Sequence, residues 1–252
     1  MQVFDVHAHL IDGPEIPDHP VLTAGYSHES NVRTLEYWAR LPSDVKPNVY
    51  LALGITPQEV IQNPVLQDTL KEDKTPSELT FIERNSSVLT GIGEIGLDLH
   101  WNRDPDILTL QKKMFSFQLD LAERLGLPVV VHSRKAEELV LDILSTYNLG
   151  VGIRGVILHS FGGNLSLARR AVDLPNTYIS IPPMKSRARK EVIKKIDVHN
   201  LLVETDYPYI GKRLSSVYDS IRMISEYSGV SLDDLYPIIY NNTLAVLGLS
   251  VK

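Results

Sequence analysis

The sequence predicts an α/β protein, a TIM (β/α)8 barrel that extends over residues 1–252 as a single domain. Two observations predict this fold. Short runs of apolar, mostly β-branched residues recur along the chain, and charged, amphipathic segments lie between them. Parallel strands that are buried on both faces have such nearly continuous apolar runs. Eight of them alternating with helices favour one closed parallel barrel, with an open, doubly wound sheet as the competing architecture.

The predicted strands, in chain order, are Val3–Val6, Val21–Ala24, Val49–Leu53, Val88–Ile92, Pro128–Val131, Gly155–Leu158, Thr177–Ile181 and Leu201–Val203. The second is the weakest prediction, because residues 12–30 are rich in Pro, Asp and His and look like a long loop. The clearest helix is Pro105–Leu125, whose apolar residues recur at a spacing close to 3.6. Gly126 then provides a stop signal before the next strand.

Composition limits the class of protein. With 43% hydrophobic and 22% charged residues, the chain can bury a full core. No stretch approaches the roughly 18 consecutive apolar residues of a membrane helix. The first residues lack the basic leader and apolar run of a secretory signal, and the sequence contains no cysteine. These features predict a cytoplasmic protein without a membrane partner. A net charge of −6 argues against a protein that coats long nucleic acid, but an enzyme could still grip one strand end through a local basic patch.

Metal-ligating side chains stand where the predicted strands end, which is where such barrels carry their active sites. In chain order they are His7, His9, Glu94, Asp98, His132, His159, Glu204 and Asp206. His7 and His9 are two residues apart, so both imidazoles can reach one ion from the same face of a strand. Each residue alone has an ordinary alternative, such as a packed histidine or an aspartate that caps a turn. Their joint placement favours a metal centre.

At these segments the sequence resembles the TatD family of metal-dependent hydrolases, in the amidohydrolase-like superfamily. The matching pieces are FDVHAHL, GIGEIGLDLHW, Gln111 in the following helix, LGLPVVVHSRKA, GVILHSFGG, LLVETDYPYI and NNTLAVLGL. They occur in the family's order and span residues 3–248. The chain departs from the family after the third strand, where Gly54-Ile55-Thr56-Pro57 replaces the usual His-Pro pair. It also has Lys135 in place of an acid, and residues 12–50 match poorly.

The resemblance implies roles for the ligand-type residues. His7 and His9 would hold one metal ion, and His132 and His159 a second. Glu94 would bridge the two ions, and Asp206 would complete the coordination of the first ion and serve as general base. Glu204 and Asp98 are expected to orient ligands. We therefore expect two divalent ions as cofactors. Zinc is the default for an imidazole-rich shell, with manganese, nickel, cobalt or magnesium as alternatives.

Three arginines are candidates for substrate binding. Arg134 lies two residues beyond His132 and could receive a phosphate through its planar fork; its alternative role is an ion pair. Arg187 and Arg189 belong to a basic stretch just after the seventh strand, where barrels often bind phosphate. A solvated helix face is the alternative for that stretch.

These observations predict a two-metal hydrolase of ester bonds. It would be a TatD-like phosphodiesterase, a deoxyribonuclease that acts on nucleic acid ends with a metal-bridging hydroxide as nucleophile. The substrate would be a nucleic acid end or a small phosphoester or ester. The first alternative is a hydrolase of carboxylic esters that uses the same centre, either an aminoacyl-tRNA deacylase or a lactonase. The second is a non-catalytic metal-binding scaffold, against which the presence of Asp206 speaks.

Overall fold

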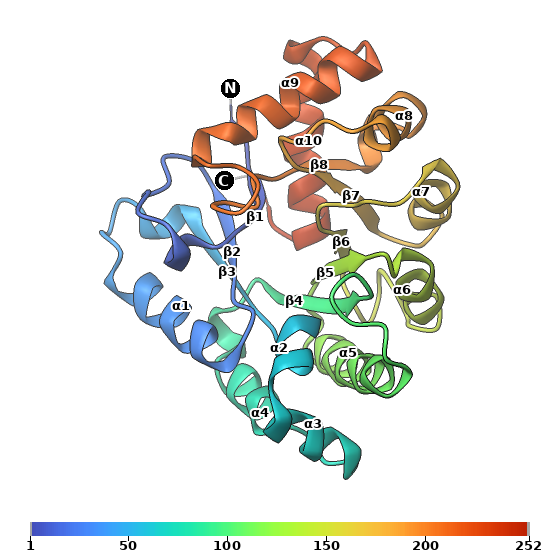
Figure 1. Ribbon diagram of the computed structural model, residues 1–252. Coiled ribbons are helices and arrows are strands. Elements are labelled where there is room, and N and C mark those ends of the chain that lie inside the picture. Colours follow the sequence, from blue (N-terminus) through green and yellow to red (C-terminus); the bar gives the residue numbers. More distant parts are fainter. Residues whose placement is uncertain (1, 251–252) are drawn as a thin grey trace.

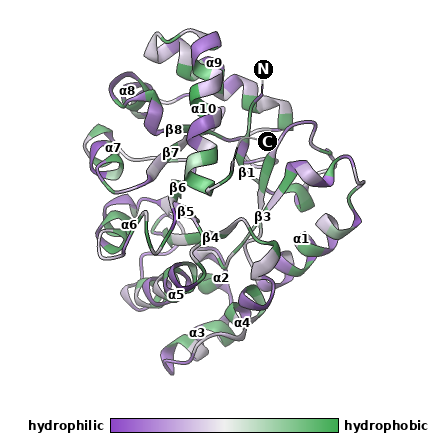
Figure 2. Cartoon of the chain, turned by 180° about the vertical axis from the view of Figure 1, so that it is seen from behind, coloured by the Kyte–Doolittle hydropathy of each residue, from purple (hydrophilic) through white to green (hydrophobic). Residues whose placement is uncertain are grey.

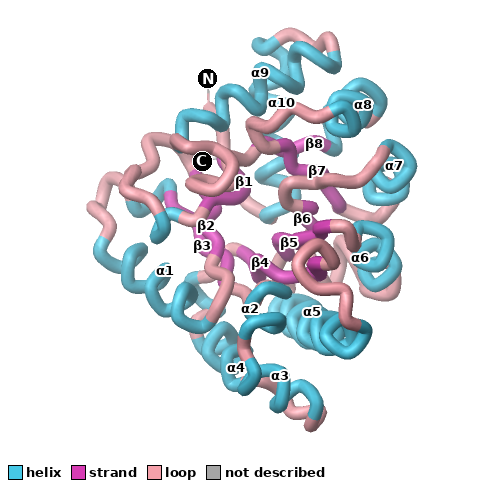
Figure 3. The backbone as a smooth tube through the Cα atoms, in the orientation of Figure 1, coloured by secondary structure: helices cyan, strands magenta, loops and turns pink. Residues whose placement is uncertain are grey.

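The computed structural model describes residues 2–250, and its eight strands form one parallel sheet in chain order (Figure 1). The strands are β1 (Asp5–Ala8), β2 (Val21–Ala24), β3 (Val49–Leu53), β4 (Gly91–Asp98), β5 (Val129–Arg134), β6 (Val156–Leu158), β7 (Thr177–Ile181) and β8 (Leu201–Val203). Figure 3 shows the strands at the centre, with the helices outside them.

The sheet closes where the first strand meets the segment after the last one. The backbone N–H of Asp206 donates to the carbonyl oxygen of His7 at 2.9 Å, and that of His9 donates to the carbonyl oxygen of Tyr207 at 2.7 Å. The buried Asp5 carboxylate accepts bonds from the Thr205 amide at 2.9 Å and the Thr205 hydroxyl at 2.5 Å. The TIM barrel is thereby confirmed, and the open, doubly wound sheet is excluded.

Strands β2, β3, β7 and β8 have the predicted bounds, whereas β1, β4 and β5 extend further toward the carboxyl end. Within the predicted fourth strand, residue 88 belongs instead to a 3₁₀ turn, Ser86–Val88. The prediction followed apolar runs and stopped at the first polar side chain. In the barrel, the strands continue through Glu94, which lies in a register shift of β4, and through His132, which pairs with Gly96. These polar residues therefore lie within strands and not beyond them.

The helices surround the barrel. They are α1 (His28–Arg40), α2 (Pro57–Gln62), α3 (Pro64–Lys71), α4 (Ser77–Arg84), α5 (Pro105–Leu125), α6 (Glu137–Leu144), α7 (Leu165–Val172), α8 (Arg187–Lys195), α9 (Val217–Ser228) and α10 (Leu232–Leu247). Short 3₁₀ turns cover Leu10–Asp12, Lys46–Asn48, Ser86–Val88, Val198–Asn200 and Leu214–Ser216. None of the helices described for residues 2–250 is long and apolar enough to cross a membrane.

Helix α5 has the predicted bounds, because its sequence carries both end signals. The Asp104 side chain caps its first turn by accepting a bond from the Asp106 amide at 2.8 Å. Gly126 ends it with a φ of 62°, a left-handed conformation that glycine adopts without strain. Leu110 and Met114 are among its buried residues. Figure 2 shows hydrophobic and hydrophilic residues on the same outer helices, as expected for amphipathic helices that cover a barrel.

An apolar floor lies beneath the carboxyl end of the strands. Val130 and Ile157 precede His132 and His159 by two residues, so they point to the same side of the sheet. They belong to a buried cluster that also includes Phe4, Val6, Leu22, Ala24, Ala52, Leu202, Val246 and Leu247. The polar side chains at the barrel mouth therefore pack against a close-packed apolar layer, which restricts their movement.

Candidate metal centre

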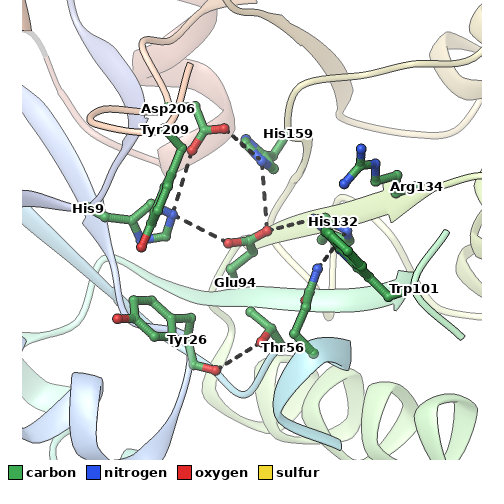
Figure 4. Close-up of a pocket in the computed structure, with 11 residues that line it drawn as sticks. His9, Tyr26, Thr56, Glu94, Trp101, His132, Arg134, His159, Asp206 and Tyr209 are labelled. Carbon is green, nitrogen blue, oxygen red and sulfur yellow. Dashed lines mark hydrogen bonds and ion pairs between the residues drawn. The ribbon is translucent and has the colours of Figure 1, made fainter. Parts of the chain in front are cut away.

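All six predicted ligands come together at the carboxyl end of the barrel. Figure 4 shows all of them except His7. They are His7 on β1, His9 after β1, Glu94 on β4, His132 on β5, His159 after β6 and Asp206 after β8. Five line a cavity of about 350 Å³, whereas His7 is fully buried.

His7 and His9 form the first pair of the centre. Their Nε2 atoms lie 3.1 Å apart. The Nδ1–H of His9 donates to the carbonyl oxygen of Ala24 at 2.9 Å, so the Nε2 of His9 carries a lone pair. The β1 strand has a register irregularity between Asp5 and Ala8, which accompanies the inward position of this segment.

Glu94 lies between the two pairs of histidines. Figure 4 shows it between His9 on one side and His132 and His159 on the other. Its Oε2 is 3.7 Å from the Nε2 of His7 and 3.6 Å from the Nε2 of His9. Its Oε1 is 2.8 Å from the Nδ1 of His132 and 3.7 Å from the Nε2 of His159. Each carboxylate oxygen thus faces one pair, which is the arrangement that a bridging ligand requires.

Asp206 completes the group from the last strand. Its Oδ1 lies 3.8 Å from the Nε2 of His7 and 3.7 Å from the Nε2 of His9. Its Oδ2 lies 4.0 Å from the Nε2 of His159. The backbone of Asp206 has a φ of 48°, which is uncommon for a residue other than glycine and is most often found for Asn, Asp and His.

Carboxylates behind the ligands fix the orientation of two imidazoles. The Nε2–H of His132 donates to Asp98 Oδ2 at 3.0 Å, which leaves Nδ1 directed at Glu94. The Nδ1–H of His159 donates to Glu204 Oε2 at 3.2 Å, which leaves Nε2 for the centre. Asp98 and Glu204 are both fully buried. The two predicted orienting residues therefore contact the ring nitrogens opposite the site.

The charges of the group are strongly coupled. Burial would raise the pKa of Glu94, but the hydrogen bond and charge of His132 and the charge of His159 hold that pKa well below its ordinary value. Burial opposes a rise for His132, yet Asp98 and Glu94 raise its pKa to about 9. Burial and the neighbouring histidines His159 and His9 lower the pKa of His7. Burial likewise opposes a rise for His159, but Glu204, Asp206 and Glu94 raise its pKa to about 10. In the absence of a metal ion, Glu94 is therefore ionised between the protonated His132 and His159, whereas His7 is neutral.

These side chains fit a metal ion. Two Nε2 atoms face each other at 3.1 Å, and the Nδ1 of the buried His7 has no hydrogen-bond partner among the described residues. The lone pair of His9 Nε2 is directed at His7 Nε2, and a cation in front of the two atoms would accept one lone pair from each imidazole. Ligand atoms lie within 4.8 Å of one another in two groups, one of His7, Glu94 and His159, the other of His7, His9 and Asp206. Imidazole and carboxylate together suit zinc, manganese, cobalt or nickel.

The backbone under His132 depends on a glycine. Gly96 in β4 has a φ of 136°, and a Cβ placed there would lie 2.0 Å from the carbonyl oxygen of His132. The absence of a side chain at this position lets β4 approach β5 at the level of the ligand. The GIGEIG segment is therefore a strand that carries Glu94, not a tight turn.

The cavity has an aromatic rim, whose residues do not stand at the ends of apolar runs. Tyr26, Trp101 and Tyr209 line it, and Trp101 and Tyr209 are 64% and 54% exposed. Asp12 joins the two tyrosines, since its oxygens accept bonds from Tyr26 at 3.3 Å and from Tyr209 at 2.9 Å. The poorly matching segment 12–50 therefore contributes to the rim. In the sequence, the rim could have been predicted only from Trp101, which directly follows the GLDLH motif at the end of β4.

Thr56 and Gln58 occupy the end of the third strand. Thr56 lines the cavity and caps α2 by accepting a bond from the Glu59 amide. Gln58 also lines the cavity, and its Nε2 donates to Asp98 Oδ2 at 2.9 Å. Gln58 was missed because it stands inside the first turn of a helix, beyond the end of the apolar run.

The three candidate arginines have different surroundings. Arg134 is exposed at the cavity, with its Cζ 5.5 Å from the ring centre of Trp101. Arg187 is exposed at the start of α8 and is not among the residues that line this cavity. Arg189, two residues further on, is buried.

Comparison with known proteins identifies the family of the chain. The family model described as "TatD related DNase" matches residues 4–248. A metal-dependent hydrolase of Bacillus subtilis, YabD, is 28% identical over 95% of this chain and 96% of that protein. A human protein named deoxyribonuclease TATDN3 is 29% identical over 66% of this chain and 62% of that protein.

A solved structure supports the fold. The crystal structure of YjjV, a TatD homologue from Escherichia coli, superimposes with a TM-score of 0.79 over 98% of each chain. The identity between the two sequences is 23%, so this likeness concerns the fold alone.

Proposed function

This chain belongs to the family of TatD-related DNases, which are metal-dependent hydrolases, and on that premise we propose that it is a two-metal phosphodiesterase acting on nucleic acid ends. The observation that carries the proposal is the position of Glu94, with one oxygen toward His7 and His9 and the other toward His132 and His159.

One ion would be held by His7, His9, Glu94 and Asp206, and the other by Glu94, His132 and His159. When bound, two divalent ions activate water and stabilise charge on the attacking and leaving oxygens of a phosphodiester. Zinc is the default choice for this set of ligands, with manganese, nickel, cobalt and magnesium as alternatives.

Asp206 is the general base in this proposal. In the metal-free protein, burial raises its pKa to about 6, against the opposing charges of His159 and His9, so its carboxylate accepts a proton more readily than a free aspartate does. As the water oxygen bonds to phosphorus and the ester P–O bond breaks, Asp206 takes the proton of the water. The backbone bond from its amide to the carbonyl oxygen of His7 holds it at the centre.

The cavity next to the centre favours a nucleotide over a small neutral ester. Trp101 and Tyr209 offer exposed rings on which a base can stack. Arg134 adds a planar cation at the same opening. The name of the human relative, a deoxyribonuclease, points to the same substrate class.

The test measures metal content and turnover in the wild type and in Asp206→Asn. The substrates are a dinucleotide and an activated carboxylic ester. We expect about two metal ions per wild-type chain and cleavage of the dinucleotide. In Asp206→Asn, kcat should fall by roughly 10²-fold or more, because general-base catalysis contributes on that order, while most of the metal stays bound.

Asp104→Asn is the matched control, because it makes the same chemical change at an exposed helix cap where asparagine also caps well. If only the carboxylic ester is cleaved, the protein is a carboxylic-ester hydrolase and the proposed phosphodiesterase function is wrong. Bound metal without turnover of either substrate would leave a scaffold, and a metal-free, inactive protein would refute the centre itself.

A further inference from the structure

Arg189 is a buried cation on the rim of the barrel. It lies in the first turn of α8, whose Ser186 cap accepts a bond from the Arg189 amide at 3.1 Å. Its side chain is only 5% exposed, although the surrounding sequence is a basic stretch that could have formed a solvated helix face. Arginine is rarely buried to this degree unless it is paired with an anion.

The protein partners of Arg189 do not balance its charge. One terminal nitrogen donates to the carbonyl oxygen of Met184 at 2.6 Å, and the other to that of Phe161 at 3.4 Å. Its Nε–H has no partner in the part of the chain that the structure describes. Within residues 2–250, Arg189 forms no ion pair. Burial lowers the pKa of Arg189, and the charge of Glu204 opposes this effect from beyond ion-pair distance.

Arg189 lines a second cavity of about 420 Å³ that continues from the metal centre. The two cavities share His132, Arg134, His159, Asp206 and Tyr209. The first carries the aromatic rings of Tyr26 and Trp101, whereas the second carries Arg189 and the buried Ser133, whose hydroxyl also has no partner among the described residues. Glu137 lines the second cavity in addition to the shared Asp206, so Arg134 and Arg189 face two carboxylates there.

We propose that this second cavity is a binding site for another phosphate of the substrate, next to the one that is cleaved. Arg189 and Arg134 would bind it, with a bond from the Ser133 hydroxyl. This inference rests on the proposed function and deepens it. The scissile phosphodiester would lie at the metal centre, a nucleoside would stack in the aromatic cavity, and the neighbouring phosphate would enter the adjoining arginine cavity.

A purely structural role for Arg189 is the competing explanation, because its two carbonyl bonds join the loops after β6 and β7. That role leaves an unpartnered N–H and an unpaired charge in a buried place, which is costly without compensation. It also requires no cavity beside the guanidinium. A bound phosphate satisfies both the charge and the free Nε–H.

The test compares three substrates with the metal-loaded protein: a thymidine dinucleotide without terminal phosphates, the same with a 5′-phosphate, and the same with a 3′-phosphate. In the wild type, kcat/KM for one of the phosphorylated forms should exceed that of the plain dinucleotide by roughly 10- to 100-fold, as expected for charge-assisted hydrogen bonds. The preferred end assigns the direction of the strand.

The substitution Arg189→Met should reduce this ratio to near unity, and Arg189→Lys should keep part of it. The control Lys194→Met removes a charge from an exposed position later in the same helix and should leave the ratio unchanged. The rise of Tm caused by inorganic phosphate should also be smaller in Arg189→Met than in the wild type. If Arg189→Met does not fold, Ser133→Ala tests the same cavity, with a smaller fall of the ratio expected.

A wild-type ratio near one would overturn the proposal, as would an Arg189→Met variant that loses Tm but keeps the ratio. If no dinucleotide is cleaved but the effect of inorganic phosphate on Tm depends on Arg189, the proposed function is wrong and the phosphate site stands.

Discussion

Single carboxylates decide which nitrogen of each histidine faces the centre. Asp98 binds the Nε2 of His132, and Glu204 binds the Nδ1 of His159, so the two rings present different atoms to Glu94. Asp98 also accepts bonds from Gln58 and from the amides of His100 and Trp101. One buried carboxylate thus connects a ligand to the loop that carries the exposed Trp.

Replacing Asp98 by asparagine should weaken metal binding at the site of His132 and His159. The amide is a weaker acceptor and can present a donor to the ring, so the imidazole loses its fixed tautomer. Metal affinity should fall roughly 10- to 100-fold, as is typical when such a supporting contact is lost. Isothermal titration calorimetry of the metal-depleted protein with zinc measures the affinity of each site, and only the affinity of the site of His132 and His159 should change.

Asp197→Asn is the matched control for this substitution. Asp197 also contacts a histidine, His199, with 2.8 Å between Oδ1 and Nδ1, but on the exposed surface. Its loss should leave both zinc affinities unchanged. Equal affinities in wild type and Asp98→Asn would mean that the position of His132 is set by packing alone.

The residues that sequence reasoning found and missed differ in a physical way. His7, Glu94, His132 and Asp206 follow apolar strand cores, so a search of strand ends reaches them. The residues Gln58, Tyr26 and Trp101 lie in helix starts and loops, and their direction depends on tertiary contacts that no local pattern encodes. The burial of Arg189 could not be predicted either, because periodicity places it in a run of exposed charges.

Among the secondary-structure elements, β4 is the most constrained. It carries Glu94 and Asp98, and all eight of its residues are buried. Its predicted start was wrong by three residues, since residue 88 belongs to a 3₁₀ turn and the strand begins at Gly91. Apolar runs locate a buried strand but not the polar residues through which its ladder continues. Helix α5 was predicted with its observed bounds because a proline and a glycine mark its ends.

The substitution Gly96→Ala should destabilise the protein strongly. The new methyl group would meet the carbonyl oxygen of His132, and the φ of 136° is unfavourable for any residue with a Cβ. Strain and overpacking together should lower the free energy of unfolding by about 3 kcal/mol or more. Urea denaturation followed by circular dichroism provides the measurement.

Gly126→Ala separates the two causes. Gly126 also has a positive φ, 62°, but a Cβ there meets nothing within 4 Å. Its replacement should cost only about 1 to 2 kcal/mol, the ordinary price of a left-handed alanine. If both variants lose the same stability, close approach of β4 to β5 is not what requires Gly96.

For the whole molecule, the centre joins strands from all parts of the chain. Ligands from β1, β4 and β5 and from the segments after β6 and β8 would share the same two ions. Bound ions would therefore cross-connect the barrel, and any ligand that binds only the native state stabilises it by mass action.

Metal removal should lower the thermal stability of the barrel. After dialysis against a chelator, the free energy of unfolding should fall for each metal site that is emptied. The fall should be about 2.7 kcal/mol per site if the free metal concentration before dialysis was 100 times the Kd of that site. Scanning calorimetry before dialysis, after it and after re-addition of zinc measures the change. A Tm that is the same in all three samples would contradict the proposal that the native centre binds metal.

The seam of the barrel has a consequence for the order of assembly. Asp5 and Thr205, whose hydrogen bonds close the barrel, are 200 positions apart along the chain. His7 and Asp206 become neighbours only when that seam has formed. A nascent polypeptide on the ribosome holds its first histidines long before the last carboxylate is synthesised. The ligands are therefore complete only after the last strand has been synthesised and the seam has formed, and a partly made chain lacks part of the centre.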